Sequence, residues 1–388
     1  MKHLTRDEHL FGPGPKRILS LDGGGIRGTM SLEFLKRMED LLRARHGGDP
    51  DFRLCDYFDL IGGNSTGAII AGALALGFSV EQLRILYREL GTEIFRRPSL
   101  RLGLFAPKFP REPLVAALTA AYGDVTLGGD AVRTGLMIAL KRVDTGSPWM
   151  VHNNPRGKYF AGGDIAGSEN ATPNRDYLLR QVVYASAAAP HYFEPERIEV
   201  APGVEGVFVD GGVAAALNPA LHTLMLASLD GYGLRWPLGA GKLLLVSVGT
   251  GVTVTRMTAE EALRIPALPS SINALFSALN DTDWLVQTVL QWMSDCPTRW
   301  QVDSEIGDLA RDSLAGRPLL TYLRYNAVFE SAWLHEQLGL DVDQAEAESL
   351  VPMDNAGSIE LLAEIGRLAA DRQVRDEHFP AGFDPPVR

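Results

Sequence analysis

The sequence predicts an α/β protein in which helices cover both faces of a mostly parallel central sheet. Three observations point to this three-layer fold. Short apolar runs recur along the chain, stretches with apolar residues at helical spacing lie between them, and two glycine-rich turns each join an apolar run to a helical stretch. Strands that alternate with helices in this way are typical of α/β/α architectures.

The two glycine-rich turns define the first two strand and helix pairs. A strand at 17–21 leads through the first turn to a helix from Ser31 onward, where apolar residues recur every three or four positions. A strand at 58–62 leads through the second turn to an Ala-rich helix that ends near Leu76. Later strands are expected at 135–143, 206–209 and 242–248, and later helices at 176–188 and 219–229.

The chain becomes mostly helical after Val252. Residues 272–293 carry a stripe of apolar side chains at helical spacing, which is typical of ordinary core packing. Neither a repeat nor a low-complexity linker separates this part from the rest. The pattern therefore fits a helical extension packed on the sheet as well as it fits a separate domain.

Composition and charge narrow the class of partner. A chain of 388 residues with 46% hydrophobic content buries a large core, and its formal net charge of −11 argues against a nucleic acid polymer as the main partner. The two cysteines, Cys55 and Cys296, are far apart, which indicates neither a disulfide framework nor a zinc site. The N-terminal residues are charged where a secretory signal needs an apolar core. We therefore expect a cytoplasmic protein, with peripheral contact at the inner membrane as a further expectation.

Two segments bear on membrane contact. Residues 61–80 carry no charge, but the glycines and polar residues at their start leave a stretch that suits a buried core helix better than a membrane span. Residues 91–111 carry five positive charges and one negative charge, interleaved with Phe95, Phe105 and Phe109. This segment is either a solvated loop whose aromatic residues anchor it to the body, or a peripheral membrane contact.

The first glycine turn has three interpretations. Gly23, Gly25 and Gly28 satisfy the G-x-G-x-x-G pattern of dinucleotide-binding folds, although this pattern alone is weak. A P-loop is excluded because the lysine that it requires is absent. In the third interpretation, the amide groups of the turn and the adjacent helix N-terminus hold the oxyanion that forms when an ester carbonyl is attacked, and Arg27 adds positive charge beside it.

The second glycine turn favours the third interpretation. Residues 63–67, GNSTG, match the G-x-S-x-G nucleophile elbow between a strand and a helix, with Ser65 as the nucleophile. A serine hydroxyl needs a base. His222, His335 and His378 do not lie in turns that follow strands, whereas Asp210 follows an apolar run and precedes two glycines. A carboxylate whose pKa is raised by burial acts as a general base, so the residues indicate a Ser65/Asp210 dyad.

Four motifs together resemble, in order and spacing, those of the patatin-like phospholipases. They are DGGGIRG at 22–28, GNSTG at 63–67, ASAAAP at 185–190 and DGG at 210–212, and the resemblance covers about residues 15–255, including SVGTG at 247–251. It implies a patatin-like α/β/α lipid acyl hydrolase that requires neither a metal nor a cofactor and acts on phospholipids or other fatty acyl esters. It also implies an N-terminal extension at 1–14, a catalytic domain at 15–255 and a mostly helical extension packed on it at 256–388.

Carried over to matching positions, the resemblance makes Ser65 the nucleophile and Asp210 the base. The oxyanion site that it implies consists of Gly23, Gly24, Gly25 and Arg27. Asp22 and Ser186 also match the motifs, and we expect structural roles for both. The chain departs from the family where Leu217 replaces the first residue of an Asn-Asn-Pro sequence.

Three alternatives remain open. The first turn fits a nucleotide-binding or dehydrogenase-like protein, and the second fits a Ser-His-Asp esterase of small soluble esters. Some bacterial patatin-like proteins of similar length are effectors that cyclic dinucleotides activate to degrade membranes, so a cyclic dinucleotide activator is a further expectation. No residue of this sequence is assigned to such a nucleotide.

Overall fold

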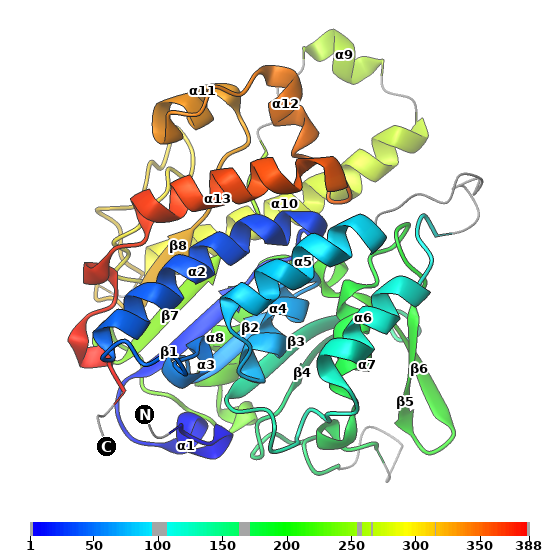
Figure 1. Cartoon of the computed structure of the whole chain (residues 1–388), viewed down its shortest axis with the longest axis vertical. Coiled ribbons are helices and arrows are strands. Elements are labelled where there is room, and N and C mark those ends of the chain that lie inside the picture. The colour runs from blue at the N-terminus through cyan, green and yellow to red at the C-terminus, as the bar shows by residue number, and fades with distance from the viewer. Residues whose placement is uncertain are drawn as a thin grey trace.

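The computed structural model describes residues 3–94, 107–162, 171–253, 258–264, 267–314 and 316–385. An eight-stranded sheet lies at its centre, with β4 paired to β3 beside the strand order β5-β6-β3-β2-β1-β7-β8 (Figure 1). The strands are β1 Lys16–Leu21, β2 Leu60–Gly63, β3 Gly135–Arg142, β4 Ser147–His152, β5 Glu196–Ala201, β6 Val204–Asp210, β7 Leu243–Val248 and β8 Thr321–Tyr325. The path from β3 to β8 is parallel, whereas β4 and β6 run antiparallel to β3, and β5 runs antiparallel to β6.

Helices cover both faces of this sheet. One face packs mainly against α2, α4, α7 and neighbouring helices, and the opposite face packs against α8 and α10. The helices are α1 Arg6–Phe11, α2 Gly28–Arg45, α3 Leu54–Tyr57, α4 Thr66–Ala75, α5 Val80–Ile94, α6 Glu112–Tyr122, α7 Leu179–Ala187, α8 Ala220–Ser228, α9 Ala259–Leu263, α10 Ala267–Met293, α11 Ser331–Trp333, α12 Gln344–Ser349 and α13 Ile359–Gln373.

The strand sequences explain why both faces are covered. In β1, Leu19 and Leu21 join the core on one side of the sheet, and Ile18, which precedes Leu19, joins the core on the other. Successive side chains of a strand point to opposite faces, so a strand such as β1, which is buried at every position, needs cover on both sides. The predicted α/β/α fold with a mostly parallel sheet is therefore confirmed.

The expected strands and helices all appear, with ends shifted by a few residues, whereas β4, β5 and β8 were not identified from the sequence. The strand β8 belongs to the part of the chain that was expected to be mostly helical. It extends the parallel sheet beyond β7, and α13 packs along α2 on one face (Figure 1). Residues beyond 255 therefore contribute to the sheet itself as well as covering it.

The uncharged stretch at 61–80 is divided between β2, a turn and the buried helix α4, as expected of a core segment. The ten residues of α4 span about 15 Å, half the thickness of a bilayer's hydrocarbon core of about 30 Å. Within the described ranges, no helix combines the length and the apolar character needed to cross a membrane.

A fully buried arginine joins β8 to the rest of the sheet. Nη2 of Arg324 lies 2.7 Å from a carboxylate oxygen of Asp22 at the end of β1 and 3.1 Å from one of Asp283 on α10. Its Nη1 donates a hydrogen bond to Oγ of Ser247 in β7, over 2.8 Å. Asp22 therefore has the structural role expected of it, because this network fixes the strand end where the first glycine turn begins.

We expect Arg324→Met to lower the free energy of unfolding by about 3–5 kcal/mol, because it leaves two largely buried carboxylates without their cation. Urea unfolding followed by circular dichroism measures the change. The matched control is Arg375→Met, whose side chain is 62% exposed, and a change within about 0.5 kcal/mol is expected there. Equal losses in the two variants would contradict a central role for the Arg324 network.

Candidate active site

Ser65 stands on a strained turn between β2 and α4. It is the residue before the helix and has φ 54° and ψ −122°, a conformation that residues other than glycine rarely adopt. The glycines on both sides permit the turn. A Cβ on Gly67 would lie 2.2 Å from the carbonyl oxygen of Leu21, and one on Gly63 would lie 2.3 Å from that of Gly67. This local geometry is that of a nucleophile elbow.

A buried hydroxyl holds the elbow in place. The N–H of Ser65 donates to Oγ of Ser186 on α7 over 2.9 Å, and this hydroxyl donates in turn to the carbonyl oxygen of Ala139 in β3 over 2.8 Å. Ser186 thus ties the turn to the sheet, which is the structural role expected of it.

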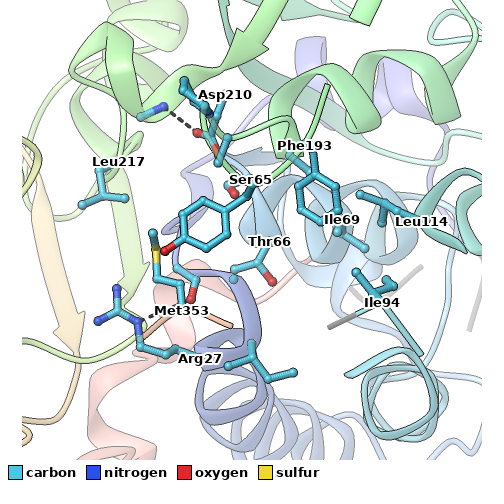
Figure 2. A pocket seen from close by; sticks show the side chains of 18 of the residues that line it. Arg27, Ser65, Thr66, Ile69, Ile94, Leu114, Phe193, Asp210, Leu217 and Met353 are labelled. Atoms are coloured by element: carbon cyan, nitrogen blue, oxygen red, sulfur yellow. Dashed lines mark hydrogen bonds between the residues drawn. The ribbon is translucent and has the colours of Figure 1, made fainter. Parts of the chain in front are cut away.

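Asp210 ends β6 and lies beside Ser65 (Figure 2). The pairing of β6 with β3 places it there, since Asp210 faces Leu140 in the register. Its Oδ1 accepts hydrogen bonds from the N–H of Gly212 over 2.7 Å and from Nδ2 of Asn64 over 3.0 Å. Burial raises the pKa of Asp210, and the neighbouring Ser65 together with the hydrogen bonds from Gly212 and Asn64 partly opposes this rise. The structure thus brings the two predicted residues of the dyad together.

The first glycine turn lies next to Ser65, because a Cβ on Gly23 would come within 3.2 Å of Cβ of Ser65. The N–H of Gly23, however, donates to the carbonyl oxygen of Leu217 over 2.9 Å. An amide that already has an acceptor is not free for a second one, so Gly23 fits the predicted role of oxyanion donor less well than its neighbours do; the oxyanion site stays a prediction. The amides of Gly24 and Gly25 line the same pocket as Ser65 and donate to no described residue.

Arg27 also lines this pocket and is 8% exposed. Its Nε donates to the carbonyl oxygen of Gly24 over 3.4 Å, and it forms no ion pair with any residue in the described ranges. Burial lowers the pKa of Arg27 to about 10, so the guanidinium remains a cation at neutral pH. A buried positive charge therefore stands beside the glycine turn.

The pocket around Ser65 has two different sides and encloses about 1160 Å³, open solvent at its mouth included. Figure 2 shows Ile69, Ile94, Leu114 and Phe193 on one side of Ser65, where they form an apolar wall. On the other side lie Arg27, Leu217 and Met353. We call the first side the apolar arm.

The three candidate histidines lie elsewhere. None of them is among the residues that line the pocket. His335 is exposed and bonded to Asp341, and Nδ1 of His378 lies 2.9 Å from the hydroxyl of Tyr325. His222 is carried by α8, and burial lowers its pKa. Among the described residues, no group of three or more His, Cys, Asp or Glu side chains is arranged to hold a metal ion.

The basic segment 91–111 is only partly described, since 95–106 lies outside the described residues together with Phe95 and Phe105. Phe109 is 1% exposed and stacks on Tyr192, with ring centroids 6.3 Å apart. Phe109 therefore anchors this segment to the body and is not available for membrane contact.

Sequence reasoning missed two contributors to the site. Asn64, whose side chain donates a hydrogen bond to Asp210, precedes the candidate nucleophile inside the G-x-S-x-G motif. Its polar side chain at that position could have indicated a contact with the base. Met353 lines the pocket from a distant part of the chain and has no motif of its own. Only the packing of the C-terminal part brings it there.

Comparisons with known proteins show the family to which the chain belongs. The profile of a family described as patatin-like phospholipase matches residues 19–223. Patatin-17 of Solanum cardiophyllum is 27% identical, over 93% of this chain and 85% of its own length. Patatin group J-1 of Solanum tuberosum is 30% identical, over 71% of this chain and 72% of its own. Human GIVD cytosolic phospholipase A2 aligns with a TM-score of 0.46 and 13% identity, over 94% of this chain and 58% of that one. With more than half of its residues matched by the family profile, the chain belongs to the patatin-like phospholipase family.

Proposed function

We propose that this member of the family is a serine lipid acyl hydrolase that cleaves fatty acyl esters through a Ser65/Asp210 dyad and an acyl-enzyme. The observation that carries the proposal is the position of Ser65, on its strained turn, beside the buried carboxylate of Asp210 (Figure 2). Both residues line a pocket whose apolar arm offers several apolar side chains for contact with a fatty acyl chain.

The proposed reaction has two steps. In the first, Asp210 accepts the proton of Ser65 while Oγ attacks the ester carbonyl carbon, and the alcohol then leaves with that proton. In the second, Asp210 accepts a proton from water, the resulting hydroxide attacks the acyl-enzyme, and the fatty acid is released as Ser65 regains its proton.

The oxyanion of both tetrahedral intermediates needs donors that are already in place. The amides of Gly24 and Gly25 meet this requirement because they donate to no described residue, and the cationic Arg27 adds positive charge beside them. A lipid binding in the pocket excludes water from these groups, which strengthens their interaction with the developing negative charge.

Covalent labelling tests the proposal. A long-chain alkyl fluorophosphonate phosphonylates an activated serine with loss of fluoride, and intact-mass spectrometry detects the adduct. One adduct is expected on the wild-type chain, and none on Ser65→Ala. Labelling at another serine would overturn the assignment of the nucleophile.

The pH dependence tests the role of Asp210. The dyad needs an ionised Asp210, so kcat/KM should fall as the pH falls through its pKa, which burial raises above the ordinary value. Asn64→Ala removes a hydrogen bond that stabilises the ionised form, so we expect its acid limb to move to higher pH. The measurement is a pH profile of kcat/KM with a soluble short-chain ester. Superimposable profiles for the two proteins would contradict this role of Asn64.

Activation by a cyclic dinucleotide and peripheral membrane contact stay predictions. The first is measured by adding cyclic dinucleotides to a phospholipid vesicle assay, and an unchanged rate of hydrolysis would exclude it.

A further inference from the structure

The pocket extends beyond the part of the chain that the family profile matches. The profile ends at residue 223, yet Leu279 and Asn280 on α10 and Met353 before α13 line the pocket. In Figure 2, Met353 lies on the opposite side of Ser65 from Leu114 and the apolar arm. The C-terminal part therefore forms a wall of the site.

Backbone contacts hold Met353 against the first glycine turn. Its carbonyl oxygen accepts a hydrogen bond from the N–H of Ile26 over 2.8 Å. A Cβ on Gly25 would lie 2.3 Å from this oxygen and 2.9 Å from Cβ of Met353. Any displacement of Met353 thus changes the space directly beside the proposed oxyanion donors.

An ion pair at the next residue, Asp354, also holds the segment around Met353 in place. Asp354, with a side chain 7% exposed, pairs with Lys108. Nζ of Lys108 lies 5.4 Å from the ring centroid of Tyr192, which also lines the pocket, and the N–H of Lys108 donates to the carbonyl oxygen of His191 over 2.8 Å. We call the Lys108 and Asp354 pair the rim clasp. It joins three distant segments at the edge of the pocket.

The two halves of an ester diverge from its carbonyl carbon. If the acyl chain occupies the apolar arm, the alcohol extends over the other side, past Arg27, Leu217 and Met353 (Figure 2). That side combines the apolar side chains of Leu217 and Met353 with the guanidinium of Arg27. It therefore suits an alcohol that carries an apolar chain beside a polar group, as in a glycerol that bears a second acyl chain.

We propose that the C-terminal part of the chain builds a subsite for the leaving alcohol, with Met353 as the residue that selects alcohols bearing an apolar chain. The inference rests on the proposed acyl-enzyme reaction. An unbranched methionine is suited to this position because its flexible thioether adapts to chains of irregular shape.

The two-step reaction supplies a specific test. We compare dihexanoyl phosphatidylcholine, below its micelle concentration, with p-nitrophenyl hexanoate, which has the same acyl chain and a small alcohol. We expect Met353→Ala to lower kcat/KM about tenfold for the first ester and less than about twofold for the second, given the usual value of a buried apolar contact. The rate of deacylation, read from the steady phase after the p-nitrophenol burst, stays unchanged because the alcohol has already left.

Two variants serve as matched controls. Leu114→Ala in the apolar arm should affect both esters alike and also change deacylation, since the acyl chain is the same throughout. Met225→Ala, at a methionine that is 39% exposed on α8, should change neither ester. An equal loss for both esters in Met353→Ala, or slower deacylation, would overturn the proposal and assign Met353 a general structural role.

A second variant avoids altering the lining of the pocket. Asp354→Asn breaks the rim clasp and should produce the same selective loss in a smaller amount. An unchanged ratio of kcat/KM for the two esters in Met353→Ala overturns the proposal, whatever Asp354→Asn shows. The proposed function fails separately, namely when the wild-type chain hydrolyses neither ester or when Ser65→Ala retains the hydrolysis.

Discussion

Replacing Ser65 by alanine is expected to lower kcat for a fatty acyl ester by at least about 10⁴-fold, because removing the nucleophile of an acyl-transfer enzyme leaves only the contribution of binding and the oxyanion site. The fold should persist, since the partner of Ser186 is the backbone N–H of residue 65, which alanine retains. Release of fatty acid from phospholipid vesicles and from a soluble ester measures the loss.

The matched control is Ser228→Ala, at a serine of α8 whose hydroxyl donates to the carbonyl oxygen of Leu224. It should retain nearly full activity. A Ser65→Ala protein that keeps more than about 1% of wild-type turnover would show that another group attacks the ester, because a true nucleophile knockout loses far more.

Replacing Asp210 by asparagine is expected to lower kcat by about 10²- to 10⁴-fold, the usual contribution of general base catalysis. The amide has the shape of the carboxylate but does not accept the proton of Ser65. The acid limb of the pH profile should disappear together with the turnover, because the group that titrates is gone. Stopped-flow or continuous ester assays over a range of pH measure both effects.

Asp144→Asn is the control for a carboxylate outside the site, since Asp144 pairs with Arg142 at the surface. A near-wild-type rate in Asp210→Asn would indicate that a different base serves Ser65. His222, His335 and His378 would then be replaced in turn, although none of them lines the pocket.

Much of the fold could be predicted from local patterns. The strands β2 and β7 contain, apart from one serine, only apolar residues and glycine, and β1 ends in the run ILSL. Such runs between helical stretches indicate buried parallel strands. The strand β8, with the sequence TYLRY, was missed because it contains the charged Arg324. This arginine is buried only because Asp22 and Asp283 neutralise it, and the two aspartates come from distant elements.

The local part of the candidate site could likewise be predicted from the sequence, whereas its contacts between distant elements could not. The elbow at Ser65 is a strand, a turn and a helix that follow one another directly, so its geometry is a property of adjacent residues. The amide of Gly23 was expected to face an oxyanion, but it donates its hydrogen bond to the carbonyl oxygen of Leu217. Leu217 stands where the chain departs from the family's Asn-Asn-Pro sequence. The contacts of Asn64 with Asp210 and of Met353 with the glycine turn join residues from separate elements.

The sequence by itself determined the layers of the fold and the two glycine turns, and it indicated Ser65 and Asp210 as the candidate dyad, because strand and helix periodicity and tight turns depend on neighbouring residues. Tertiary structure alone decided which amides of the first turn are free, how Arg324 is neutralised and which residues wall the pocket opposite the apolar arm. These features arise where elements far apart in the chain pack together. The hydrophobic effect that drives such packing is non-directional, so no local sequence pattern predicts which distant segment packs beside Ser65.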